Sequence, residues 1–135
     1  MPPIMNCILL VDDDKVTNFY HKVFLKQGNY AKKIVEVSSA IEALDYLLSK
    51  KETFVKPDII FLDINMPGLN GWDFLEQYRH LDEKLKGSLI FMFLSTAVTP
   101  EYQVLLDNHE ELTGYVAKPI EKDGIEEILS NYIYK

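Results

Sequence analysis

Short hydrophobic segments recur along the chain, and longer amphipathic segments separate them. Three of the short segments contain only hydrophobic residues: 7–11, Ile59–Leu62 and Leu89–Leu94. Apolar runs of this length between turn signals are typical of strands buried on both faces, as in a parallel sheet. Two weaker segments, Ala31–Val37 and Gly114–Ala117, are predicted as further strands. The pattern therefore predicts five strands.

Helices are predicted between the strands, because apolar residues there recur at three- and four-residue spacing. The first interval carries such a stripe, which we expect to pack against the sheet: Val16, Phe19, Tyr20, Val23 and Phe24. Ser39 followed by Glu42 is a capping-box pattern at the start of a second helix. A third helix is predicted around residues 72–78, and a Thr-Pro pair at 99–100 starts a fourth. The last stripe, residues 125–133, continues almost to the end of the chain.

The order of elements is a strand followed by a helix, five times over. Such alternation demands a parallel sheet with helices on both faces, and right-handed crossovers restrict its topology. A strand order of 2-1-3-4-5 fits best, because strands one, three and four are the most apolar and should be central. We therefore predict an α/β fold for one domain over residues 1–135, with no internal repeat or linker.

Composition and charge exclude several functions. The chain is 47% hydrophobic and 26% charged, which is typical of a globular domain. Its net charge of −7 argues against direct binding to nucleic acid or to an anionic membrane. No apolar run approaches the ~18 residues of a membrane span, and no signal peptide is visible. Cys7, the single cysteine, is expected to be buried. We expect a soluble protein in a reducing, cytoplasmic compartment.

Polar residues stand at the ends of four predicted strands: Asp12 and Asp13, then Asp63, Thr96 and Lys118. In the predicted strand order these ends meet at one edge of the sheet, near the switch point where ligands bind in open α/β folds. Asp63 alone is as consistent with a turn residue as with a functional acid. The combination of three carboxylates, a hydroxyl and an ammonium group favours a functional site.

Three adjacent carboxylates require compensation. At ~4 Å and an effective dielectric constant near 20, each pair repels by about 4 kcal/mol. Lys118 neutralises at most one charge, and a divalent cation such as Mg²⁺ suits the remaining oxygen ligands. An aspartate can also act as a nucleophile and become an aspartyl phosphate. Mg²⁺, Lys118 and Thr96 would then each contact one phosphoryl oxygen.

Four segments of this sequence carry a family resemblance that covers the whole chain. They are Leu10-Val11-Asp12-Asp13, Asp63-Ile64-Asn65-Met66-Pro67 with Gly71, Ser95-Thr96-Ala97, and Gly114-Tyr115-Val116-Ala117-Lys118-Pro119. In order and near-identical spacing they resemble the receiver domain of two-component response regulators, of the stand-alone, chemotaxis-regulator-like type. The resemblance implies the flavodoxin-like receiver fold.

The resemblance also implies residue roles. Asp63 would be the phosphoacceptor. Asp13, Asp63 and the main-chain carbonyl of Asn65 would ligate Mg²⁺, for which Mn²⁺ can substitute, and Asp12 would act partly through water. Lys118 would pair with the phosphoryl group. The only catalysis implied is Mg²⁺-dependent self-phosphorylation and autodephosphorylation at Asp63.

The remaining family positions concern the switch. Thr96, with Ala97 beside it, would bind the phosphoryl group and shift on activation. Tyr115 would be the aromatic switch residue that turns inward. The Lys118–Pro119 peptide bond would be cis, which X-Pro bonds permit at small cost.

The implied partners are a histidine kinase or a His-containing phosphotransfer protein upstream, and a protein target downstream. The fourth helix, fifth strand and fifth helix would form the output surface. Because the final helical stripe runs to the end of the chain, no output domain is expected. The chain would then signal by contact or pass its phosphoryl group onward, as a monomer or as a weak, phosphorylation-dependent dimer.

Four other polar residues are interpreted as structural. Asp14 is expected to cap a helix or to be solvated, because the family pattern needs only two acids there. The three histidines, His21, His80 and His109, are predicted to be surface residues away from the acidic edge. None of them has a metal-ligand spacing.

Three alternative functions fit the sequence less well. An aspartyl-nucleophile phosphatase needs a second acid two residues after the nucleophile, where this chain has Asn65. A flavin carrier needs a hydroxyl- and Gly-rich loop after strand one, where this chain has three acids that repel phosphate. A receiver that has lost phosphorylation would not need the full set of polar strand ends. An apolar Val98 further predicts that the phosphoryl group is not among the fastest to hydrolyse.

Overall fold

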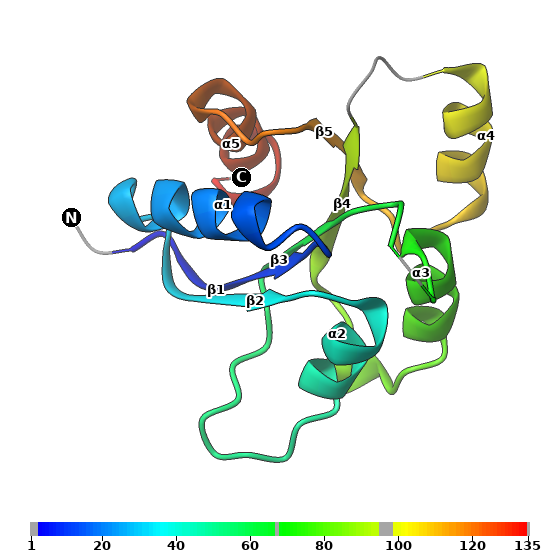
Figure 1. Cartoon of the computed structure of the whole chain (residues 1–135), viewed down its shortest axis with the longest axis horizontal. Helices are drawn as coiled ribbons and strands as arrows, with labels where there is room; N and C mark the ends of the chain where they lie inside the picture. Colours follow the sequence, from blue (N-terminus) through cyan, green and yellow to red (C-terminus); the bar gives the residue numbers. More distant parts are fainter. Residues whose placement is uncertain (1–2, 67, 95–98, 135) are drawn as a thin grey trace.

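The computed structural model describes residues 3–66, 68–94 and 99–134. Its centre is a five-stranded parallel sheet with the predicted order β2-β1-β3-β4-β5 (Figure 1). The strands are β1 (Met5–Val11), β2 (Ala31–Val37), β3 (Ile59–Leu62), β4 (Leu89–Leu94) and β5 (Gly114–Ala117). The helices are α1 (Lys15–Gln27), α2 (Ala40–Leu47), α3 (Gly71–Arg79), α4 (Pro100–Asn108) and α5 (Lys122–Ile128), with a 3₁₀ turn η1 (Glu83–Leu85) and a π-helical segment η2 (Leu129–Ile133).

Two hydrophobic cores lie on opposite faces of the sheet. Residues of a strand point alternately to the two faces, so Ile8 and Leu10 of β1 join the core with α1 and α5. Leu9 and Val11 join the core with α2 and α3. Helices therefore cover both faces (Figure 1), which explains why β3 and β4 are hydrophobic at every position and β1 is hydrophobic from Cys7 onward. Cys7 is fully buried in β1, as predicted.

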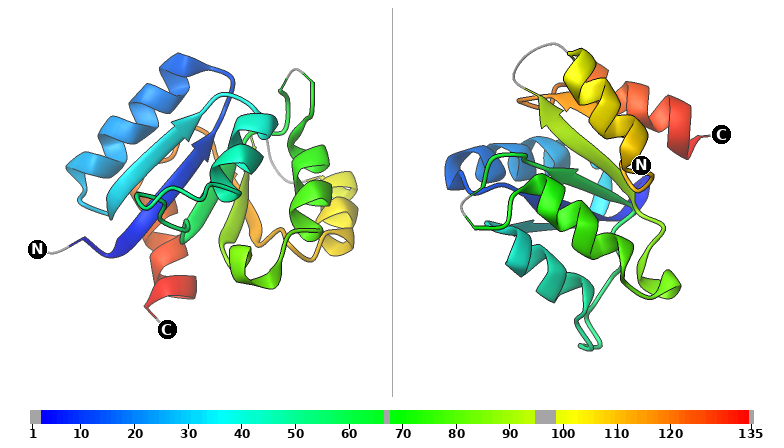
Figure 2. Two further views of the ribbon diagram at one scale, coloured as in Figure 1. Left: turned by 90° about the horizontal axis from the view of Figure 1, so that it is seen from below. Right: turned by 90° about the vertical axis from the view of Figure 1, so that its right-hand side faces the viewer.

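The two ends of the sheet differ. Both chain termini lie at the edge where the strands begin, and the β1–α1 and β3–α3 loops lie at the opposite edge (Figure 2). Because all five strands are parallel, their carboxyl ends share that second edge. No helix in the described part of the chain is long and apolar enough to cross a membrane.

Side-chain caps mark the starts of α1, α2 and α3. Asp14 caps α1 by accepting hydrogen bonds from the main-chain N–H groups of Val16 and Thr17. Ser39 caps α2 as predicted, but the Glu42 carboxylate accepts from Ser38 N–H instead of closing a reciprocal box on Ser39. A complete capping box does occur at α3, between Asn70 and Asp73, and the sequence interpretation missed it. This cap fixes the helix that follows the Asp63 loop.

The orientation predicted for α1 is wrong. Four residues of the predicted buried stripe are exposed: Val16 by 78%, Phe19 by 63%, Tyr20 by 49% and Val23 by 37%. The face of α1 toward the sheet carries Asn18, His21 and Leu25 instead. Helical spacing identifies a stripe but not the side on which it lies. Here the polar stripe is buried because main-chain groups of other elements offer hydrogen bonds to Asn18 and His21.

The end of the chain is partly as predicted. Ile125, Ile128 and Leu129 are buried against the sheet. The single helix expected there divides into α5 and η2, and Tyr132 is 44% exposed. The hydrophobic stripe therefore anchors the last helix mainly through its first half.

Candidate functional site

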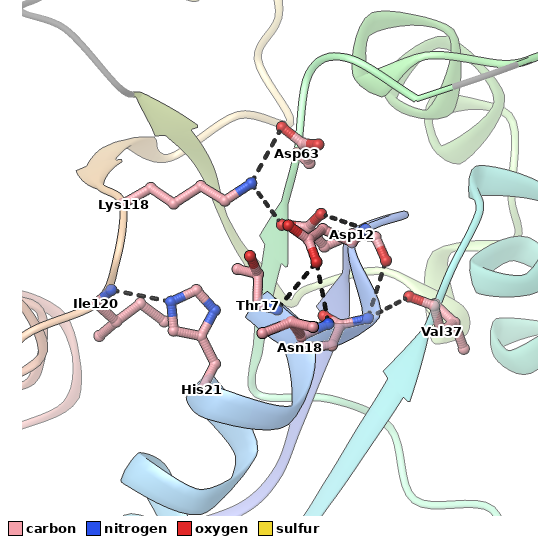
Figure 3. Close-up of polar contacts among 10 residues, drawn as sticks. Asp12, Thr17, Asn18, His21, Val37, Asp63, Lys118 and Ile120 are labelled. Atoms are coloured by element: carbon pink, nitrogen blue, oxygen red, sulfur yellow. Dashed lines mark hydrogen bonds and ion pairs between the residues drawn. The ribbon is translucent and has the colours of Figure 1, made fainter.

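The carboxyl edge of the sheet brings together the acids and the lysine that the sequence singled out (Figure 3). Val11 of β1 lies beside Leu62 of β3 in the ladder, so the residues that follow them, Asp12 and Asp63, leave the sheet together. The main-chain N–H of Asp63 donates to Val11 O at 2.9 Å, which fixes this register. On the far side, Lys118 follows β5 directly, and its N–H donates to Leu94 O of β4.

The ammonium group of Lys118 bridges two carboxylates. Lys118 Nζ lies 2.7 Å from Asp12 Oδ2 and 3.8 Å from Asp63 Oδ1. The Asp12 side chain is fully buried, whereas the Asp63 side chain keeps 16% of its surface exposed. Asp12 is therefore a fixed internal anion, and Asp63 is the carboxylate that an incoming group can reach.

Asp13 completes an acidic cluster. One carboxylate oxygen of each of Asp12, Asp13 and Asp63 lies within 4.8 Å of the others. With all three ionised and Lys118 protonated, the formal charge of the group is −3 + 1 = −2. Hard divalent cations prefer several oxygen ligands that include carboxylates. The donor set and its uncompensated charge therefore fit a bound Mg²⁺.

The excess negative charge of the cluster also affects the pKa of Asp63. Burial raises the pKa of this carboxyl above its ordinary value, and the negative charge of Asp12 raises it further. Lys118 and a hydrogen bond from the main-chain N–H of Asn65 lower it, but they do not cancel the increase. Ionising Asp63 is thus less favourable than ionising a free carboxyl group, and a nearby cation would stabilise the ionised form.

Asn18 holds the acidic edge in place. Its Nδ2 donates to Asp12 O at 2.9 Å and to Val37 O at 3.0 Å, so one buried side chain joins the ends of β1 and β2 (Figure 3). Asp12 Oδ1 in turn accepts the main-chain N–H of Asp14 at 2.9 Å. Asp14 itself is a helix cap, as predicted, and hydrogen bonds from Thr17 lower its pKa.

The loop after Asp63 closes tightly against α3. Gly71 N–H donates to Ile64 O at 2.9 Å. A Cβ atom at position 71 would lie 2.7 Å from Asp63 O and 3.0 Å from Ile64 Cα, both main-chain atoms. Glycine is therefore required at position 71 for the loop to pass this close to Asp63.

The structure describes some of the other predicted site residues and leaves others outside the described residues. Thr96 and Ala97 lie outside the described residues, as do their neighbours Ser95 and Val98. Asn65 is exposed beside Asp63. Tyr115 is half-buried and packs against the core shared with α2 and α3. The Lys118–Pro119 peptide bond is cis.

The histidines separate into three environments. His80 is exposed, as predicted, and His109 is half-buried, with Nδ1 2.8 Å from Leu105 O. The surface prediction for His21 is wrong, because this residue is fully buried below Lys118 (Figure 3). Asn18 was likewise not anticipated in the site. Asn18 and His21 are three residues apart on α1, which indicates that they share one polar face of the helix. Only the packing of α1 against the sheet shows that this face is buried.

Comparison with known proteins defines the class. The family model for the response regulator receiver domain matches residues 8–130. The chain therefore belongs to the response regulator receiver family. The five-stranded order and the helices on both faces agree with that fold.

Individual relatives are more distant. The chain is 28% identical over 123 residues to the transcriptional regulatory protein BtsR of Escherichia coli, covering 91% of this chain and 46% of BtsR. It thus spans about half the length of such curated relatives. It is 26% identical over 129 residues to sporulation initiation phosphotransferase F of Bacillus subtilis, covering 93% of this chain and 92% of that protein.

A solved two-component response regulator from Cytophaga hutchinsonii superimposes with a TM-score of 0.81 at 26% identity. The alignment covers 93% of this chain and 94% of that structure. Almost the whole chain therefore has the same fold as that response regulator. Together with the family match, this identifies the chain as a receiver domain of two-component phosphorelay signalling.

Proposed function

We propose that Asp63 accepts a phosphoryl group from a phosphohistidine, in a Mg²⁺-dependent reaction, and that the chain then signals by a conformational switch or relays the group onward. The observation that carries this proposal is the position of Asp63. Its carboxylate is partly exposed, lies within 3.8 Å of Lys118 Nζ and shares a cluster with Asp12 and Asp13.

In the proposed step, an oxygen of the Asp63 carboxylate attacks phosphorus as the bond from phosphorus to the imidazole nitrogen breaks. The electron pair of that bond stays on the imidazole, which leaves as a neutral ring after protonation. Lys118 Nζ can turn from the carboxylates to a phosphoryl oxygen and stabilise its charge. A bound Mg²⁺ would supply positive charge beside the acids and the phosphoryl oxygens, and Mn²⁺ can substitute.

The exposed apolar face of α1 supports a protein as the phosphodonor. We define this α1 face as Val16, Phe19, Tyr20 and Val23, all at least 37% exposed. It begins two residues after Asp14, next to the acidic cluster. Clustered exposed hydrophobic residues mark interaction surfaces. A helical domain that carries a histidine could cover this face and present its phosphoimidazole to Asp63.

Signal output is proposed to use the surface of α4, β5 and α5. Lys118 directly follows β5, so a change in its partners acts on that strand's end. Tyr115 on β5 is half-buried, and Val104 on α4 is 56% exposed. Phosphorylation would shift the population between two conformers of this region.

Asn65 favours a relay over a phosphatase. A phosphatase of the aspartyl-nucleophile class protonates its leaving group with an acid at this position, and the Asn65 amide carries no acidic proton. The aspartyl phosphate would therefore persist long enough to be read or transferred.

The test is incubation with acetyl phosphate and Mg²⁺, followed by intact-protein mass spectrometry. The wild type should gain one phosphoryl group. The Asp63→Asn variant should gain none, whereas Asp45→Asn, a change at an exposed acid on α2, should behave as the wild type. A wild type that stays unmodified with Mg²⁺ present would contradict the proposal, and so would equal modification of the Asp63→Asn variant.

A further inference from the structure

His21 connects α1 to the segment that carries Lys118. Its side chain is fully buried, and its Nε2 accepts a hydrogen bond from the main-chain N–H of Ile120 at 3.0 Å. The two residues are 99 positions apart in the chain. Ile120 lies two residues after Lys118, in the loop between β5 and α5. Figure 3 shows the imidazole below the lysine, bonded to this loop.

The hydrogen bond fixes the chemical state of the imidazole. Because Nε2 accepts a hydrogen bond, it carries no proton, and the neutral ring holds its proton on Nδ1. Nδ1 is buried and has no hydrogen-bond partner among the described residues. An unpaired buried donor is unfavourable, and an aliphatic residue would avoid it. The contribution that only the histidine makes at this position is therefore the hydrogen bond that its Nε2 accepts.

A second contact leads to the same lysine. The His21 ring stacks on Phe93 of β4, with ring centroids 5.1 Å apart and planes at 20°. Lys118 Nζ lies 5.6 Å from the centroid of the same Phe93 ring. One side chain thus contacts both the main chain beside Lys118 and the aromatic surface on which its ammonium group lies. Burial also lowers the pKa of His21 to about 4, so the ring is a neutral acceptor at pH 7.

We propose that His21 is a positioning residue for Lys118: it holds the β5–α5 loop through Ile120 N–H, and so places the ammonium group between Asp12 and Asp63. The effect on reaction rate rests on the proposed phosphorylation of Asp63. The effect on the lysine is independent of it, because the ion pair between Lys118 and Asp12 exists in the unphosphorylated protein.

Two substitutions separate the acceptor from the ring. His21→Phe keeps an aromatic ring against Phe93 but cannot accept the Ile120 hydrogen bond. His21→Gln loses the ring but offers a side-chain carbonyl to the same N–H. Exposed His80 provides the control variant His80→Gln. All four proteins are compared in phosphorylation by acetyl phosphate with Mg²⁺, and in hydrogen exchange at the Ile120 amide.

We expect His21→Phe to slow phosphorylation about tenfold and to speed Ile120 exchange by a similar factor, because a small misplacement of a charge-stabilising group reduces the rate. His21→Gln should recover most of both, and His80→Gln should match the wild type. Equal rates in wild type and folded His21→Phe would overturn the proposal. So would a His21→Gln protein as slow as His21→Phe, since restoring a hydrogen-bond acceptor at this position would then not restore the placement of Lys118.

Spectroscopy of the unphosphorylated protein tests the proposal independently of the phosphorylation rate. Nitrogen-15 chemical shifts of His21 should show the tautomer with the proton on Nδ1, and Nε2 should show scalar coupling to the Ile120 amide. A proton on Nε2 would overturn the proposal. If the wild type accepts no phosphoryl group, the proposed function fails, but these shifts and the Nζ signal of Lys118 in His21→Phe still decide whether His21 positions the lysine.

Discussion

The two faces of α1 reverse the usual distribution of polar and apolar residues. The face toward the sheet buries Asn18 and His21, which contact main-chain groups of Asp12 directly after β1, of Val37 at the end of β2 and of the β5–α5 loop. The opposite face leaves Phe19 and Val16 more than half exposed. A polar side chain can be buried where fixed donors or acceptors meet it. Apolar side chains left exposed from the start of α1 onward, two residues after Asp14, suit contact with a partner protein. The buried face organises the site, and the exposed face suits recognition.

Lowering the pH should produce the largest effect on the buried face. The pKa of His21 is about 4 in the folded protein, mainly through burial, against 6.5 in the unfolded chain. Asp12 raises this pKa and Lys118 lowers it. Between these values the unfolded chain binds more protons, so stability is complete above pH 6.5 and declines as pH falls toward 4. The loss should reach about 3 kcal/mol at most.

Urea denaturation of the wild type and His21→Gln at pH 7 and pH 4.5 measures this loss. Because the carboxylates titrate in both proteins, the difference between their pH slopes isolates His21. Parallel slopes would show that His21 titrates alike in the folded and unfolded chains.

Removing the Asn18 side chain from the same face should have the next largest effect on stability. Asn18→Ala deletes the donor to Asp12 O and one of the donors to Val37 O, which also accepts Asp12 N–H. We expect a loss of about 2 kcal/mol in the free energy of unfolding. Asn131→Ala, at an exposed asparagine, is the matched control and should change stability by less than about 0.5 kcal/mol. Equal losses in the two variants would contradict a stabilising role for the hydrogen bonds of Asn18.

The acidic cluster should respond to a divalent cation. A ligand at about ten times its Kd adds about 1.4 kcal/mol to the stability of the state that binds it. Thermal unfolding with increasing MgCl₂ should therefore show a rising Tm in the wild type. Asp13→Ala should lose this response, and the exposed Asp45→Ala should keep it. A similar rise in all three proteins would indicate a nonspecific salt effect.

The exposed face should show the smallest effect on stability. Phe19→Ser is expected to change the free energy of unfolding by less than about 0.5 kcal/mol, because this side chain is 63% exposed. The same change should slow phosphotransfer from the phosphorylated histidine domain of a kinase that phosphorylates the wild type. Phosphorylation by acetyl phosphate should stay unchanged. Ile41→Ser, at a 57% exposed residue on α2, is the control. Equal rates of phosphotransfer to the Phe19→Ser and Ile41→Ser proteins would show that the α1 face does not bind the phosphodonor.

Much of this protein is determined by its sequence alone. Continuous apolar runs such as Ile59–Leu62 specify strands with no solvent face, and their alternation with helices leaves essentially one sheet order. Asp12, Asp63 and Lys118 follow from the same pattern, because residues directly after parallel strands must share an edge. These are local signals, repeated in every strand–helix unit.

Only the tertiary structure decided which side of α1 is buried. Spacing marks both the Val16–Phe19–Tyr20–Val23 stripe and the Asn18–His21–Leu25 stripe as helical faces, and hydrophobicity favours the first. The choice depends on acceptors and donors supplied from distant positions, above all Ile120 N–H, 99 residues away. The free energy of such a hydrogen bond belongs to two segments at once, so neither segment reveals it alone.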